Sequence, residues 1–229
     1  MSIRENIDRV EERIRAACAR GGRRREDIRL IAVSKTFSAG NVREAYEAGL
    51  RDFGENRVQE AAAKIPELAD LDATWHLIGH LQTNKARRAY ELFGWIHAVD
   101  SFHLAEKLDQ EARRKGNRLP ILLEVNLGGE ESKYGIGERD VREVGEKVAL
   151  LPGLALRGLM LIPPFFADSR EARPFFRRLR ELAADLASSG LSGLSELSMG
   201  MSHDFEVAIE EGATMIRVGT AIFGARRTG

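Results

Sequence analysis

The chain has 229 residues, of which 43% are hydrophobic, enough to bury the core of one large folded unit. Lysine plus arginine and aspartate plus glutamate both number 35, and this balance argues against nucleic acid as the main partner. No apolar run approaches the roughly 20 residues that span a bilayer, and the N-terminus lacks the apolar region of a secretory signal. The single cysteine, Cys18, excludes an intramolecular disulfide framework. We therefore expect a cytoplasmic protein without nucleic-acid or membrane partners.

The first segment is expected to form an amphipathic helix. Apolar residues recur at three- and four-residue steps from Ile3 to Ala17, which marks one buried face. Ser2 and Glu5 have the spacing of a capping box at the start of this helix, and the pair Gly21-Gly22 marks its end.

Short apolar runs then alternate with amphipathic stretches rich in Ala, Glu and Arg. Strands that alternate with helices indicate βα units and a parallel sheet. Eight such strands favour a closed barrel over an open sheet, and a barrel of this kind commonly needs around 250 residues. The expected fold is α/β: a single (β/α)8 TIM-type barrel over residues 1–229, with an additional N-terminal helix. The predicted strands are 28–35, 51–55, 74–79, 95–99, 119–126, 154–162, 194–199 and 214–219, and the predicted helices include 39–48, 56–68, 101–115, 139–150, 170–188 and 203–210.

Lys35 stands at the end of the first predicted strand, where the active sites of (β/α)8 barrels lie. Alternation along a strand places Ile31, Val33 and Lys35 on one face. If the two apolar residues fill the barrel interior, the lysine points into its mouth. Desolvation there favours the neutral amine, which attacks aldehydes. Position alone favours a lysine that merely reaches into solvent, and it is the polar residues at the other strand ends that support a reactive one.

The seventh and eighth strands end in residues suited to phosphate. The segment SMGMSHD closes the seventh strand and RVGT closes the eighth. These are the two strands at which (β/α)8 barrels often bind phosphate, through loop amides and a helix N-terminus. Gly200 and Gly219 would let the backbone approach the ligand closely, and Ser202 and Thr220 would add hydroxyl donors. The simpler interpretation is that these glycines and hydroxyls only form turns.

Arg217 shares the parity of Met215 and Gly219, so it is expected to point into the barrel just below the phosphate site. A buried arginine needs an acceptor, and a pyridine nitrogen would serve. Because a guanidinium keeps its proton, that nitrogen would stay unprotonated and the ring would withdraw electrons poorly. The alternative is an ion pair between Arg217 and an interior carboxylate, Glu55 or Glu124.

Two further strand ends are polar. Asn56 follows the second strand and His80 follows the third, and both are placed to border a planar ring, although a purely structural role fits His80 equally well. His76 and His80 straddle a strand end outside any HExxH pattern, so we do not expect a metal site. The sequence also lacks a GxSxG motif, a P-loop and a complete dinucleotide fingerprint. Cys18 lies on the opening helix, away from the strand ends, which argues against a catalytic thiol.

Five segments together resemble the pyridoxal phosphate homeostasis protein family. They are AVSKT (32–36), GENRVQE (54–60), WHLIGHLQTNK (75–85), LSMGMSHDFEVAI (197–209) and IRVGTAIFGAR (216–226), and they occur in family order and spacing over almost the whole chain. The resemblance implies a barrel like the N-terminal domain of alanine racemase, with pyridoxal 5′-phosphate (PLP) bound as a Schiff base. By matching positions, the implied site consists of Lys35 as the Schiff-base lysine, Ser202, Gly219 and Thr220 at the phosphate, Ser198 and Met199 nearby, Arg217 at the pyridine nitrogen and Asn56 beside the ring.

The resemblance further implies a protein of intracellular PLP homeostasis, without established turnover, that holds the cofactor and serves apo PLP-dependent enzymes. A second interpretation is a PLP-dependent amino-acid racemase. Racemisation needs acid–base groups on both faces of the substrate; alanine racemases supply the second from another domain that we do not expect here, and Tyr134 is the one tyrosine expected near the mouth. A third interpretation, a Schiff-base aldolase without cofactor, would require a phosphosugar to explain Ser202, Thr220 and Arg217. We expect a monomer, since no exposed apolar stripe is evident.

Overall fold

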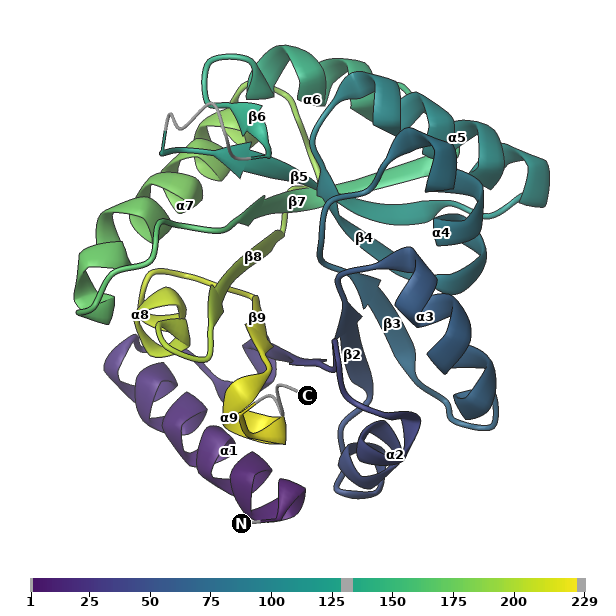
Figure 1. The fold of residues 1–229 in the computed structure, drawn as a ribbon. Helices are drawn as coiled ribbons and strands as arrows, with labels where there is room; N and C mark the ends of the chain where they lie inside the picture. Colours follow the sequence, from purple (N-terminus) through teal and green to yellow (C-terminus); the bar gives the residue numbers. More distant parts are fainter. Residues whose placement is uncertain (1, 129–133, 226–229) are drawn as a thin grey trace.

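A closed barrel of eight parallel strands forms the centre of the computed structural model, which describes residues 2–128 and 134–225 (Figure 1). Neighbouring strands pair in parallel around the ring, and pairing of β4 with β5 closes it. This confirms the predicted (β/α)8 fold. The ring comprises β1 (Arg29–Val33), β2 (Asp52–Glu55), β3 (Thr74–Leu77), β4 (Trp95–Val99), β5 (Leu119–Asn126), β7 (Leu154–Leu161), β8 (Glu196–Met201) and β9 (Met215–Val218), while β6 (Ile136–Gly137) pairs with the end of β5.

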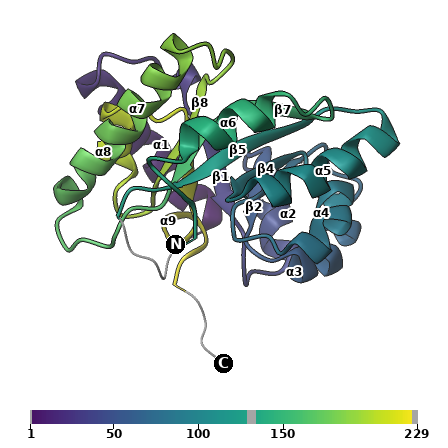
Figure 2. The ribbon, with the colours of Figure 1, turned by 90° about the horizontal axis from the view of Figure 1, so that it is seen from above.

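Helices surround the barrel (Figures 1 and 2). Figure 2 shows α1, α7 and α8 on one side of the strands and α2 to α5 on the other. The helices are α1 (Ile3–Arg20), α2 (Ala39–Glu47), α3 (Val58–Lys64), α4 (Ala86–Leu92), α5 (Phe102–Lys115), α6 (Val141–Ala149), α7 (Arg173–Ser188), α8 (Phe205–Glu210) and α9 (Thr220–Phe223), with short 3-10 turns at Arg25–Asp27, Ile65–Leu68, Thr83–Lys85 and Ser169–Ala172.

The additional helix α1 has the predicted cap. The Ser2 hydroxyl accepts from the Glu5 amide at 3.2 Å, and the Glu5 carboxylate accepts from the Ser2 amide at 2.9 Å. The apolar face of α1 packs against α2, α8 and α9. Since α9 has only four residues, α1 covers the part of the barrel that a full-length last helix would otherwise cover.

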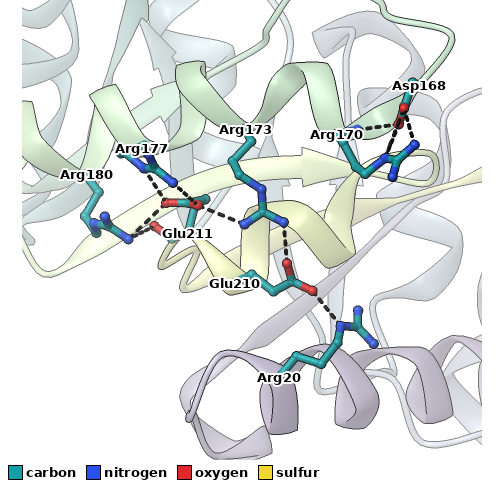
Figure 3. A network of polar contacts seen from close by, with 8 residues as sticks. All are labelled: Arg20, Asp168, Arg170, Arg173, Arg177, Arg180, Glu210 and Glu211. Carbon is teal, nitrogen blue, oxygen red and sulfur yellow. Dashed lines mark hydrogen bonds and ion pairs between the residues drawn. The ribbon is translucent and has the colours of Figure 1, made fainter.

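A network of arginines and glutamates joins α1, α7 and α8 (Figure 3). Glu210 accepts from Arg20 of α1 at 2.6 Å and from Arg173 of α7 at 2.5 Å. Glu211, which is buried, accepts from Arg173 at 2.9 Å and from Arg177 at 3.1 Å. Networks of this kind contribute more than isolated surface pairs, because neighbouring charges share the cost of ordering the side chains. The network therefore fastens α1 to the barrel.

Strand alternation separates two apolar regions. Ile31 and Met215 belong to a small cluster inside the barrel, together with Ala98, Leu122 and Met160. Ala32 belongs to the much larger core between the strands and the helices. This confirms the prediction that Ile31 faces the barrel interior and that Ala32 faces the helices. Val33 lies on the inner face at the mouth of the barrel.

Several element boundaries differ from the prediction. The predicted helix 56–68 is divided, because α3 ends at Lys64 and a 3-10 turn that contains Pro66 follows. Strand β8 ends at Met201 rather than at residue 199. Gly200 adopts a φ of 91°, and the register of the pairing with β9 shifts between Ser198 and Met201. This irregularity lets the strand continue past the glycine. Helix α4 and strand β6 were not predicted.

Candidate functional site

A cavity of about 370 Å³ opens at the carboxyl ends of the strands, a volume in the range of small-molecule sites. It brings together six of the predicted site residues, which come from four different strand ends. Its lining consists of Val33, Lys35, Asn56, Ile78, Gly79, Ile162, Met201, Ser202, His203, Arg217, Gly219 and Thr220.

The loop that carries Lys35 into this cavity is held in an unusual conformation. Lys35 lies half-buried two residues beyond β1. The next residue, Thr36, has a φ of 69°, which is rare for a β-branched side chain and costs conformational energy. Its amide donates to Glu60 Oε1 at 2.5 Å. This bond offsets part of the strain and fixes the direction in which the chain leaves Lys35.

A buried ion pair lies directly behind this loop. Lys64 Nζ lies 2.6 Å from Glu55 Oε1 and donates to the Ser34 carbonyl at 2.8 Å, while the Ser34 hydroxyl donates to the same Glu55 oxygen at 2.7 Å. Burial raises the pKa of Glu55, and the contact with Lys64 opposes this shift. Because Ser34 precedes Lys35 and Glu55 precedes Asn56, the pair holds both strand ends in place. Lys64 was missed by sequence analysis, although it continues the buried face of α3.

Two residues proposed for phosphate contact are bonded to each other. Ser202 Oγ accepts from the Gly219 amide at 3.1 Å, which joins the ends of β8 and β9. The hydroxyl retains its own O–H as a donor. Thr220 follows, with its side chain exposed at the cavity. Gly200 is not part of the cavity lining, and a glycine is required there for α8 to pack, because a Cβ would lie 2.6 Å from Ala208 Cβ.

Arg217 lies beneath the cavity and is 3% exposed. Its Nη1 donates to Ser198 Oγ at 2.6 Å, and its Nη2 donates to the Leu161 carbonyl at 3.0 Å. Burial lowers the pKa of Arg217 to about 10, which leaves it a cation at neutral pH. Within residues 2–128 and 134–225, no carboxylate forms an ion pair with it, and Glu55 is engaged by Lys64 instead.

The other predicted site residues lie outside the cavity lining. Ser198 is fully buried below Arg217, and Met199 packs in the core between strands and helices, because neighbouring strand residues face opposite ways. His80 Nδ1 lies 2.9 Å from Asp100 Oδ2, and its ring stacks on Tyr134 with the centroids 3.7 Å apart. This pair stands beside Gly79 at the rim of the cavity.

The alanine racemase N-terminal domain family matches residues 3–227. The pyridoxal phosphate homeostasis protein of Pseudomonas aeruginosa is 49% identical over 100% of this chain and 97% of its own length, and that of Aquifex aeolicus is 45% identical over 99% and 100%. The chain belongs to the pyridoxal phosphate homeostasis protein family. The structure of one similar protein, PipY of Synechococcus elongatus with PLP bound, matches with a TM-score of 0.87 and 44% identity, over 97% of this chain and 100% of PipY.

In this member of the pyridoxal phosphate homeostasis family, Glu124 is a second interior ionisable group, which sequence analysis offered only as an alternative ion-pair partner of Arg217. It follows the inward-facing Leu122 by two residues on β5, and its Oε2 is buried without a hydrogen-bond partner among the described residues. Burial raises the pKa of Glu124 to about 7; the charge of Asp100 acts in the same direction and that of Arg217 opposes it.

This raised pKa predicts a pH-dependent stability. Between the ordinary pKa of 4.5 and about 7, the folded protein binds more protons at Glu124 than the unfolded chain does. The free energy of unfolding should therefore fall as the pH rises through this window, by up to about 3 kcal/mol. Glu124→Gln should lack this component. Urea unfolding of the wild type and of Glu124→Gln at several pH values measures the free energy of unfolding of each. If the difference between these two free energies does not change with pH, the assignment to Glu124 is contradicted.

Other features of this family member lie away from the strand ends. A larger depression, of about 600 Å³, lies on the outer surface between α6 and α7 and contains none of the predicted site residues. No helix in the described part of the chain combines the length and the apolar character needed to cross a bilayer. Over the same residues, no cluster of three or more His, Cys, Asp or Glu side chains is arranged to bind a metal ion.

Proposed function

We propose that this chain binds PLP in the cavity through a covalent bond between Lys35 Nζ and the aldehyde carbon, and that it stores the cofactor and releases it to apo-enzymes. The observation that carries the proposal is the convergence of Lys35, the hydroxyls of Ser202 and Thr220, and Arg217 on one cavity. The PLP-bound structure of PipY, which covers the same fold at 44% identity, supports the choice of ligand.

The residues fit the chemistry of PLP, which supplies an aldehyde that condenses with amines and a pyridine ring that withdraws electrons. Lys35 provides the amine. Ser202 and Thr220 provide hydroxyl donors for the phosphate oxygens. Arg217 would face the ring nitrogen and, because it keeps its proton, would leave that nitrogen unprotonated. A ring in this state withdraws electrons weakly, which favours storage of the cofactor over turnover of an amino acid.

The phosphate contacts predict a graded loss of binding. Thr220→Val or Ser202→Ala should weaken the retention of PLP by about tenfold, because each removes a hydrogen bond to a charged group. The covalent bond should still form, since Lys35 is unchanged. Equilibrium dialysis of the loaded proteins measures retention, and Ser192→Ala, in the exposed turn before β8, is the matched control. Unchanged retention in both variants would show that the phosphate lies elsewhere.

Release to an apo-enzyme is the test of the proposed role. The loaded protein should restore the activity of a defined apo PLP-dependent enzyme as the two are mixed. The same protein, reduced with borohydride so that the ligand stays attached, should restore none. If the unreduced protein also restores no activity, the delivery role is overturned.

A racemase activity would require an acid–base group opposite Lys35. Tyr134, the tyrosine expected near the mouth, stacks on His80 and is not part of the cavity lining in the described part of the chain. We therefore expect the loaded protein to incorporate no appreciable deuterium at Cα of single L-amino acids in deuterated water. Mass spectrometry of the recovered amino acid measures this, and exchange at catalytic rates would replace storage with turnover as the function.

A further inference from the structure

A chain of buried hydrogen bonds runs through the barrel interior from Arg217 to the opposite end of the strands. Arg217 Nη1 donates to Ser198 Oγ at 2.6 Å, and Ser198 Oγ lies 2.9 Å from His97 Nδ1. His97 Nε2 lies 3.0 Å from His76 Nδ1, and His76 Nε2 lies 2.9 Å from Asp52 Oδ1. The three central residues are fully buried. The five side chains come from five strands, β9, β8, β4, β3 and β2.

The two ends of this chain fix the direction of every bond in it. Arg217 can only donate, and the carboxylate of Asp52 can only accept. His76 therefore carries its proton on Nε2 and accepts at Nδ1, so His97 must also carry its proton on Nε2. The hydroxyl of Ser198 then donates to His97 Nδ1 and accepts from Arg217. Burial lowers the pKa of both histidines, well below the ordinary value for His97, which agrees with neutral rings.

The series of hydrogen bonds holds Arg217 in place without neutralising its charge. Among the described residues, its acceptors are Ser198 Oγ and the Leu161 carbonyl, which are both neutral, and no carboxylate there forms an ion pair with the guanidinium that faces the cavity. The negative end of the chain is Asp52, at the start of β2, whose side chain is 24% exposed and lies 3.9 Å from Arg29. Glu124 and Asp204 act on Arg217 through their charge, without a hydrogen bond to it among the described residues. A carboxylate bonded directly to the guanidinium would instead compete with a ligand for it.

We propose that Asp52, His76 and His97 are positioning residues for Arg217: Asp52 fixes the tautomers of the two histidines, and these orient Ser198 so that Arg217 is held against the ring nitrogen of the ligand. The effect on the ligand rests on the proposed function, since it takes the ligand to be PLP. The direction of the hydrogen bonds from Arg217 to Asp52 does not depend on the identity of the ligand.

Asp52→Asn is the test variant, because it changes the far end of the chain and leaves the cavity lining intact. The amide can donate as well as accept, so the direction of the bonds is no longer fixed. In the reversed direction, N–H donors of His97 and Arg217 would both point at Ser198 Oγ. The serine oxygen can accept both bonds, but its own O–H would then lose His97 Nδ1 as its acceptor. A buried donor without a partner is costly, so the hydroxyl is expected to reorient and the guanidinium to lose its fixed position. Asp70→Asn, which breaks a surface ion pair with Arg43 outside the barrel, is the matched control.

The first readout is 15N NMR of the histidine side chains in the protein without PLP. We expect wild-type and Asp70→Asn proteins to show both His76 and His97 as Nε2–H tautomers, and Asp52→Asn to populate Nδ1–H forms. An Nδ1–H tautomer of His97 in the wild type would overturn the proposal. This measurement is made on the wild-type protein, so it is informative even if Asp52→Asn does not fold.

The second readout is PLP binding by absorbance titration. Asp52→Asn should bind PLP about tenfold more weakly than the wild type, with a changed absorbance spectrum, and Asp70→Asn should match the wild type. Altered tautomers with unchanged binding and spectrum would overturn the link to Arg217. A wild-type protein with the expected tautomers but no PLP binding would overturn the proposed function, and with it the ligand role of Arg217, while the order of the hydrogen bonds would stand.

Discussion

Lys35→Ala is expected to abolish the covalent PLP adduct and its visible absorbance, while weaker non-covalent binding persists. Lys35 carries the only primary amine among the described residues that line the cavity, whereas Ser202, Thr220 and Arg217 would still bind the rest of the ligand. Absorbance spectra recorded after the addition of PLP, before and after dialysis, measure both parts of the prediction.

The control for this experiment is Lys115→Ala, which removes an exposed lysine at the end of α5 and should leave the spectrum unchanged. A visible band of normal intensity that survives dialysis in Lys35→Ala would contradict the assignment. It would mean that another amine carries the ligand.

Lys64→Met should have the largest effect on stability. It leaves the Glu55 carboxylate buried without its cation, and breaking a buried pair in this way costs about 3–5 kcal/mol. Because protonation of Glu55 relieves the cost, the loss should be largest at high pH and shrink as the pH falls. Urea unfolding at pH 5 and pH 8 measures the free energy of unfolding at the two limits.

The double variant Glu55→Leu/Lys64→Met separates the pair from general packing effects. Replacement of both charges by apolar side chains removes the uncompensated carboxylate, so the double variant should recover most of the stability that the single variant loses. If Lys64→Met alone is as stable as the wild type at both pH values, the ion pair does not support the ends of β1 and β2.

The fold was readable from sequence because strands buried on both faces form continuous apolar runs, and each was followed by a helical stretch. Parity along a strand was sufficient to place Lys35 and Arg217 at the mouth of the barrel, since alternation is a local property of the backbone. The shortest helices and strands contain too few residues to show an apolar pattern in the sequence. Helix α4 spans only two turns and buries just Ala86 and Ala89, so no apolar period was visible.

The interior contacts could not be predicted in the same way. Which residue of β4 meets His76 depends on how neighbouring strands are staggered around the closed ring, and no spacing within the chain encodes that stagger. The partner of Glu55 likewise comes from the next helix rather than from the barrel. Sequence analysis therefore named Glu55 and Glu124 as the alternative partners of Arg217 besides a pyridine nitrogen, whereas the protein partners in the structure are a hydroxyl and a carbonyl.

The central claim is that Lys35 Nζ bonds covalently to PLP, and one measurement tests it most directly. The protein is loaded with PLP, reduced with borohydride and digested, and the modified peptide is identified by mass spectrometry. We predict the mass of a reduced phosphopyridoxyl group on Lys35 and on no other lysine in significant amount. Attachment to a different lysine, or a digest in which every lysine is unmodified, would contradict the claim.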